Sequence, residues 1–196
     1  MHAFLALILL GLPALALANA GLPMLIVVWP LSLGAIIPVI ALESWVVERE
    51  LGVGWRIAIR QVSKANIFST LLGLPLTWLA LVVLEFVLAS LVISTGASRS
   101  YPPQFFGEVG RTILAAPWLG PITRGEHWIV PVATISLLIP FFFASYWSET
   151  WLIADRLSPS TPALARQALW RANLASYLLL LAGCVVWLVI GIFLHG

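Results

Sequence analysis

The sequence predicts an all-α membrane protein: a four-helix transmembrane bundle built from two helical hairpins of the same topology, preceded by a signal peptide. Composition is the first observation behind this prediction. Of the 196 residues, 61% are hydrophobic and only 9% are charged, whereas a soluble domain carries roughly 25% charged residues. The apolar residues form continuous runs, and a run of about 20 such residues can cross the hydrocarbon layer of a membrane.

The second observation is an internal repeat. The segment ESWVVERELGVGWRIAIRQ, residues 43–61, aligns without a gap with ETWLIADRLSPSTPALARQ, residues 149–167. After a one-residue offset the match resumes, and residues 65–67 and Ser69 correspond to residues 172–174 and Ser176. Each copy places the same polar residues where one apolar run ends and the next begins. The repeat therefore predicts a duplicated helical hairpin.

Four parts follow from this pattern: a signal peptide (residues 1–20), a first transmembrane hairpin (21–93), an external connection (94–127) and a second transmembrane hairpin (128–196). The first part has a short apolar stretch that ends in Ala18 and Ala20, an A-x-A pattern typical of a cleavage site. An uncleaved anchor is the alternative, because His2 and the amino terminus are the only positive groups near the start.

The predicted spans are residues 22–47, 67–93, 128–151 and 174–194. Prolines 23, 30 and 38 indicate that the first span is kinked and packed inside a bundle, where neighbouring helices satisfy the freed carbonyls. Residues 52–64 carry Arg56, Arg60 and Lys64 on one face, a pattern typical of a helix lying in the membrane interface. Ser160 or Thr161, followed by Pro162, signals the start of the last helix.

Positive charge sets the predicted orientation. The two hairpin loops, residues 48–64 and 155–171, contain seven of the ten Lys and Arg residues. The positive-inside rule places such loops in the cytoplasm. Both hairpins then run out, in, out, so the repeat is parallel, with a pseudo-two-fold axis along the membrane normal. The expected location is the bacterial inner (plasma) membrane.

Each hairpin has a polar corner near its loop. The candidate residues are Glu43, Arg60, Gln61 and Asn66 in the first hairpin, and Glu149, Arg166, Gln167 and Asn173 in the second. We expect each glutamate to reach the cytoplasmic boundary and to meet the Arg, Gln or Asn of its own hairpin, because polar side chains join membrane helices. The alternative is a pair of symmetry-related sites for an ion, a lipid head group or a partner loop.

Glu85 breaks the internal symmetry, because its counterpart in the second hairpin is Ile192. A carboxylate within a span is costly unless it is paired or hydrated, so Glu85 is a functional candidate. The alternative is that Glu85 reaches the outer interface, since the second predicted span is longer than a crossing requires.

Motifs for catalysis, cofactors and metals are absent from the sequence. It contains no HExxH, GxSxG or phosphate-loop pattern. Cys184 is the only cysteine, which excludes a disulfide within the chain. Glu126 and His127 are adjacent but have no third metal ligand. The basic residues are spread over several loops, which argues against a nucleic-acid partner.

The sequence therefore predicts a non-enzymatic, multi-pass membrane protein that acts as a structural or accessory component. Its expected contacts are the lipid bilayer and either another membrane protein or its own copy, with no cofactor. The alternative is a small transporter or channel for ions or small solutes, in which Glu85 and the polar corners line a path between the hairpins.

Overall fold

The computed structural model describes residues 22–94, 112–113, 115–119, 128–158 and 161–195. Within these ranges the chain is helical apart from two strands of two residues each. The segment predicted to be a signal peptide, residues 1–20, lies outside the described residues, and so does most of the predicted connection, residues 94–127.

The first half of the chain contains α2 (Leu25–Leu51), α3 (Trp55–Phe68), the π-helical turn η1 (Ser69–Gly73) and α4 (Leu74–Ser94). The second half contains α6 (Ile129–Leu157) and α7 (Pro162–His195). In the described part of the chain, four helical stretches of 27 to 33 residues are long and apolar enough to cross a membrane. The prediction of a helical chain with four membrane-length segments is confirmed.

The prediction of a separate interfacial helix at residues 52–64 is wrong. These residues instead begin the second long helix, because α3 continues through η1 into α4. The apolar face of α3, with Ala58, Val62 and Ala65, packs in one core with Val47 of α2 and Ile153 of α6. Helices therefore cover this face of α3, whereas Trp55 at the start of the helix is exposed.

Each hairpin turn has a local cause. α2 ends where Gly52 adopts a φ of +64°, a left-handed conformation that glycine tolerates, and the Gly52 N–H donates to Glu48 O at 2.9 Å. α7 begins at Pro162, whose fixed φ and missing N–H suit the first turn of a helix. Ahead of it, the Ser158 and Thr161 hydroxyls lie 2.6 Å apart.

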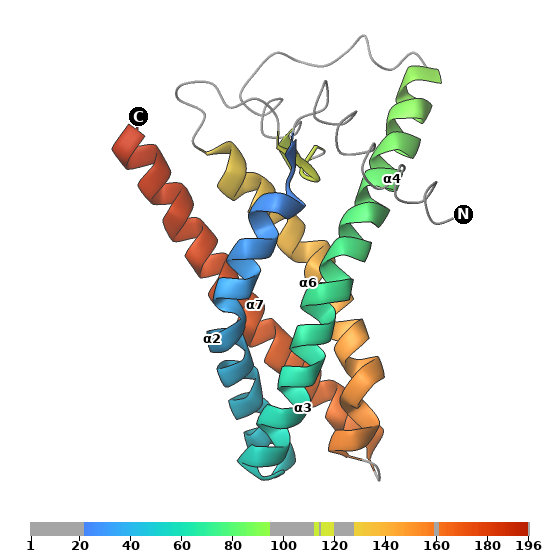
Figure 1. Cartoon of the computed structure of the whole chain (residues 1–196), viewed down its shortest axis with the longest axis vertical. Helices are drawn as coiled ribbons and strands as arrows, with labels where there is room; N and C mark the ends of the chain where they lie inside the picture. Colours follow the sequence, from blue (N-terminus) through green and yellow to red (C-terminus); the bar gives the residue numbers. More distant parts are fainter. Residues whose placement is uncertain (1–21, 95–111, 114, 120–127, 159–160, 196) are drawn as a thin grey trace, which may run out of the picture.

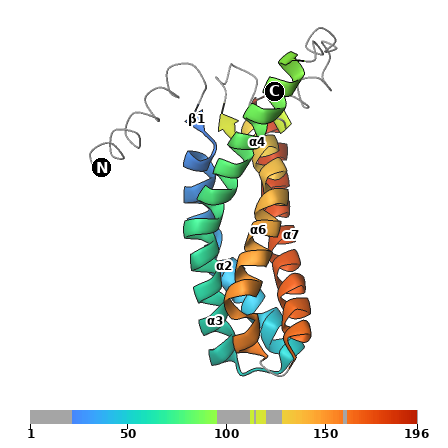
Figure 2. The ribbon, with the colours of Figure 1, turned by 90° about the vertical axis from the view of Figure 1, so that its right-hand side faces the viewer.

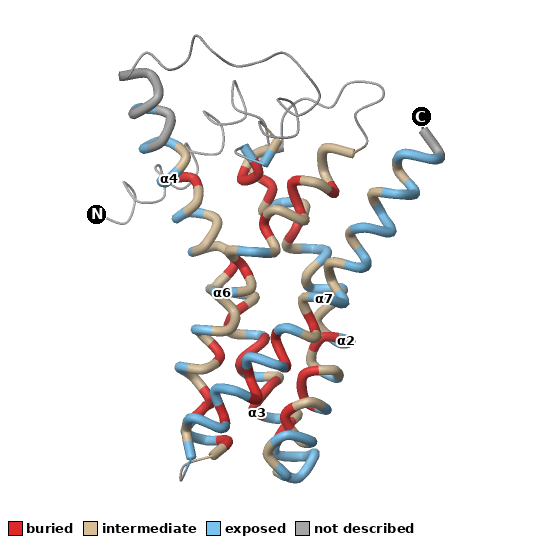
Figure 3. Tube along the Cα trace, turned by 180° about the vertical axis from the view of Figure 1, so that it is seen from behind, coloured by how far each residue is buried: buried red, intermediate tan, exposed pale blue. Residues whose placement is uncertain are grey.

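Both hairpin turns lie at the same end of the molecule (Figures 1 and 2). α2 and α6 run toward that end, whereas the α3–η1–α4 helix and α7 run away from it. α2 packs against α3 and α7, and α6 packs against the same two helices. Farther from the turns, α4 and α7 splay apart (Figure 1), and much of the last part of α7 is exposed (Figure 3).

Two hydrophobic cores hold the bundle together. The core near the turns contains Val47, Ala58, Val62, Ala65, Ile153, Ala154, Leu157, Ala165, Leu169 and Ala172. The core near the other end contains Met24, Val28, Leu74, Ala116, Ala133, Leu137 and Phe141. Strands β1 (Leu22–Pro23) and β2 (Trp118–Leu119) pair antiparallel beside the second core. This pairing fixes the start of α2 against the described part of the connection.

The π-helical turn η1 lies directly before the first turn of α4, which contains Pro75. Proline has no N–H, and in a regular α-helix its ring clashes with the carbonyl four residues earlier, here that of Leu71. Leu71 lies inside η1, so the wider turn coincides with the place where the α-helical pattern is disrupted. Proline alone does not produce such a turn, because α2 and α6 are α-helical across Pro30, Pro38 and Pro140. The turn begins at Ser69, which takes part in the site described next.

Candidate functional site

Two buried glutamates lie between the four long helices. Glu43 on α2 and Glu149 on α6 are each 1% exposed. Both were expected at the end of a span, but each helix continues for eight more residues, to Leu51 and Leu157. Eight residues correspond to about 12 Å of helix. The carboxyl groups therefore lie inside the bundle rather than at its turn.

An asparagine from the same hairpin holds each glutamate. Asn66 Nδ2 donates to Glu43 Oε2 at 2.6 Å, and Asn173 Nδ2 donates to Glu149 Oε2 at 2.8 Å. Each amide also donates to the carbonyl four residues earlier in its own helix, at 3.2 Å in both cases. The sequence offered Arg, Gln or Asn as partners. In the structure, asparagine bonds to both carboxyl groups.

A serine from the opposite hairpin completes each contact. Ser176 Oγ on α7 donates to Glu43 Oε1 at 2.5 Å, and Ser69 Oγ in η1 donates to Glu149 Oε1 at 3.3 Å. Both serines belong to the sequence repeat, but they were not among the expected partners of the glutamates. Their spacing carried a stronger signal, since each lies three residues after its asparagine and so shares its helix face.

The remaining corner candidates lie elsewhere. Arg60, Arg166 and Gln167 are exposed, and Gln61 is buried with an Oε1 that has no hydrogen-bond partner among the described residues. Helix geometry explains why Arg60 does not share the face of Asn66. Six residues separate them, and a rotation of about 100° per residue places them on different faces.

The burial pattern also changes the alignment between α3 and α7. Buried Ala58, Val62 and Ala65 on α3 correspond to buried Ala165, Leu169 and Ala172 on α7. The one-residue offset thus extends over the whole buried face, and Gln61 corresponds to Ala168, not to Gln167. The Arg-Gln pairs that align in the sequence therefore do not occupy equivalent positions.

The donors to the two glutamates are all neutral. No lysine or arginine takes part in the described network. The ion pair that joins the two halves, Arg171 Nη1 to Glu50 Oε2 at 2.5 Å, lies at the surface. Ser69, which donates to Glu149, also donates to the backbone carbonyl of Asn66, the residue that donates to Glu43, so the two carboxyl groups belong to one network. Burial of a carboxylate without a positively charged partner is costly, so this site favours the neutral, protonated form or a bound cation.

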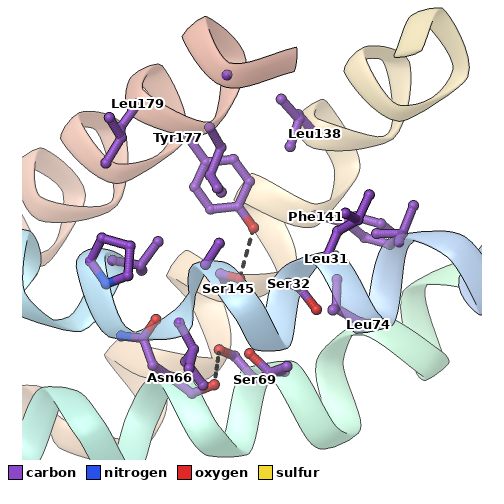
Figure 4. A pocket seen from close by; sticks show the side chains of 18 of the residues that line it. Leu31, Ser32, Asn66, Ser69, Leu74, Leu138, Phe141, Ser145, Tyr177 and Leu179 are labelled. Carbon is purple, nitrogen blue, oxygen red and sulfur yellow. Dashed lines mark hydrogen bonds between the residues drawn. The ribbon is translucent and has the colours of Figure 1, made fainter. Parts of the chain in front are cut away.

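A cavity of about 620 Å³ opens beside these glutamates. Both carboxylic residues line it, together with Asn66 and Ser69, and most of its wall is apolar (Figure 4). A second polar feature of the wall is the pair of Ser145 and Tyr177 hydroxyls, 3.0 Å apart. Glu43, Glu149, Asn66 and Ser69, called the polar floor below, thus share one cavity, called the chamber, with a mostly apolar lining.

Glu85 lies outside this cavity. It is half-buried on α4, where the Trp118 side chain forms a hydrogen bond with it. Trp118 in turn packs edge-on against Trp78, with ring centroids 5.6 Å apart, and Trp78 Nε1 donates to Pro117 O at 2.8 Å. Glu85 thus contacts the described part of the connection, at the end of the bundle opposite the hairpin turns.

Metal ligands are not grouped in the described part of the chain, where no cluster of three His, Cys, Asp or Glu residues occurs. The Glu126–His127 pair lies outside the described residues. Comparison of this chain with protein-family models, with curated proteins and with solved structures gives no match.

Proposed function

We propose that this chain is a non-enzymatic, multi-pass protein of a bacterial inner membrane that acts as a structural or accessory unit. The observation that carries the proposal is the crossed hydrogen-bond network. Glu43 accepts from Asn66 of its own hairpin and from Ser176 of the other hairpin. Glu149 accepts in the same way from Asn173 and Ser69. Such a network fixes two hairpins into one body, as interhelical polar contacts do in membranes.

The two hairpins, in this proposal, are parallel repeats related by a pseudo-two-fold axis along the membrane normal. Support comes from the repeated sequence, from the position of both turns at one end (Figure 1), and from the reciprocal Glu–Asn–Ser contacts. A rotation that exchanges α2 with α6 also exchanges α3 with α7, and the observed packing partners follow that exchange.

In the proposed orientation both turns lie in the cytoplasm. Residues 1–20 act as a signal peptide that is removed from the mature chain. The charge bias supports the orientation, since the hairpin loops carry most of the Lys and Arg residues. The rigid body would then contact either another membrane protein or its own copy through its lipid-facing helices.

A combined assembly and flux experiment tests the structural role. The full chain is purified in mild detergent, its assembly is measured by light scattering, and it is reconstituted into liposomes. A structural or accessory unit forms a defined assembly with itself or a second polypeptide. It also gives proton, Na⁺ and K⁺ fluxes equal to those of empty liposomes. A monomer without a partner, or a flux above that background, contradicts the proposal.

The second candidate is a small transporter or channel for ions or small solutes, and the cavity favours it. Two buried carboxyl groups line a chamber, and intramembrane carboxylates mark many ion paths. If this candidate is right, wild-type protein conducts and Glu43→Gln or Glu149→Gln reduces the flux, because each removes one charge while preserving side-chain shape. Glu85→Gln is the matched control, because Glu85 does not line the cavity.

A further inference from the structure

The cavity beside Glu43 and Glu149 has two kinds of wall. One group of lining residues consists of the two glutamates with Asn66 and Ser69, and the rest of the lining is mostly apolar, with Leu138, Phe141 and a few hydroxyl groups. Small-molecule sites commonly enclose about 300–1,000 Å³, with mostly apolar walls and a few polar groups that orient the ligand. The cavity, at about 620 Å³, has the size and polarity of such a site.

The floor retains unused hydrogen-bond capacity. A carboxylate offers about four acceptor positions, and the protein donors to Glu43 are Asn66 Nδ2 and Ser176 Oγ. The protein donors to Glu149 are likewise two, Asn173 Nδ2 and Ser69 Oγ. The free capacity is thus acceptor capacity, which a ligand carrying several N–H donors would satisfy.

We propose that this cavity binds an amphipathic organic cation, with its primary ammonium group at the Glu43–Glu149 floor and its apolar body along the chamber. A primary ammonium provides three N–H donors and one positive charge. It would therefore supply a positive charge, which the neutral Asn and Ser donors do not provide. This site goes beyond the structural role proposed above, and it requires no transport.

Other occupants fit the chamber less well. An anion would face two carboxyl groups, and a hydrated inorganic cation would place water against apolar walls. The aromatic residues Phe141, Tyr177 and Trp187 also line the cavity and offer surfaces for an apolar body. Leu31, Leu179 and Trp187 are lining residues that are also exposed, so the chamber reaches the outer surface of the bundle. A ligand dissolved in the apolar layer of the membrane would have direct access.

The test compares three probes that share one chain and differ in head group: decylammonium, decanol and decanoate. The full chain is placed in phosphatidylcholine nanodiscs, and binding is followed by tryptophan fluorescence against empty discs. We expect saturable binding of decylammonium, with decanol and decanoate at least about tenfold weaker, because a charged hydrogen bond adds that much affinity. Equal binding of decanol would show a purely apolar cavity and overturn the proposal.

Three variants separate the floor from the walls. Glu43→Gln and Glu149→Gln should each weaken decylammonium binding at least about tenfold and leave decanol binding unchanged. Gly183→Leu places a side chain in the chamber, because Gly183 lines it and a Cβ there meets no atom within 4 Å. This variant should lose binding while keeping its thermal stability. Glu85→Gln is the control and should bind like wild type.

Unchanged decylammonium affinity in the two glutamine variants, or in Gly183→Leu, would refute the assignment. If the glutamine variants do not fold, Gly183→Leu and the head-group comparison on wild-type protein still decide the question. The structural role is judged separately, from the assembly and the flux of wild-type protein without probe. A chain that forms a stable assembly but does not discriminate among the three probes would keep the structural proposal and reject the cation site.

Discussion

Ser176 Oγ lies 2.5 Å from Glu43 Oε1, although the two residues are 133 positions apart in the chain. This hydrogen bond joins α7 to α2, and the contact of Ser69 with Glu149 joins η1 to α6 at 3.3 Å. Each glutamate thus depends on both hairpins for its hydrogen bonds. The buried network is therefore a property of the assembled bundle and not of either hairpin alone.

Removal of the crossing hydroxyl should destabilise the bundle. We expect Ser176→Ala to lower the free energy of unfolding by about 0.6–2 kcal/mol, the range for one interhelical hydrogen bond in a membrane protein. Ser69→Ala should cost less, because its bond to Glu149 is longer. Thermal unfolding in detergent measures both effects. Ser90→Ala is the control, since exposed Ser90 bonds only to Phe86 O of its own helix; equal losses in all three variants would refute the role of the crossing bonds.

Removal of either asparagine should cost more than removal of a serine. Asn66→Ala and Asn173→Ala each leave a buried carboxyl group without one of its donors, which costs about 1–3 kcal/mol. Arg60→Ala and Gln167→Ala are matched controls on the same helices, and both positions are exposed. Surface changes of this kind usually stay within about 0.5 kcal/mol. If chemical or thermal unfolding shows a larger loss of stability in the two exposed variants than in the two asparagine variants, the network does not lock the hairpins.

Substitution of Glu85 should have little effect on folding. In Glu85→Gln the side-chain carbonyl still accepts the hydrogen bond from Trp118, and an amide group replaces the buried Oε2 atom, which already has no partner among the described residues. We expect the melting temperature in detergent and the ion flux in liposomes to match wild type. If wild-type protein conducts ions and this variant alone loses the flux, Glu85 belongs to an ion path and the transport route lies along α4.

Cysteine labelling tests the proposed topology. In a Cys184→Ser background, Arg60→Cys and Arg166→Cys should react only after the cells are permeabilised, because the positive-inside rule places these exposed positions in the cytoplasm. Arg111→Cys, in the predicted external connection, should react in intact cells with a reagent that cannot cross membranes. Labelling of position 60 from outside would reverse the orientation.

Local sequence determined the helical segments and the two Glu–Asn pairs of the site. Long apolar runs predicted four membrane-length helices, since unpaired backbone groups are costly in lipid. The repeat by itself also singles out Glu43, Asn66, Glu149 and Asn173. The prediction failed for residues 52–64, which were assigned to a separate interfacial helix although residues 55–64 begin the continuous helical stretch Trp55–Val87.

Only the tertiary structure decided which partners the polar residues meet. The period of a helix fixes which residues share a face, so it can group Ser69 with Asn66 and separate Arg60 from them. It cannot say which distant helix that face will touch. The contacts of Ser176 with Glu43 and of Trp118 with Glu85, and the cavity between α2, α6 and α7, arise from packing between segments far apart in the chain. Such contacts depend on the simultaneous fit of several helices, and no single segment of the sequence contains that information.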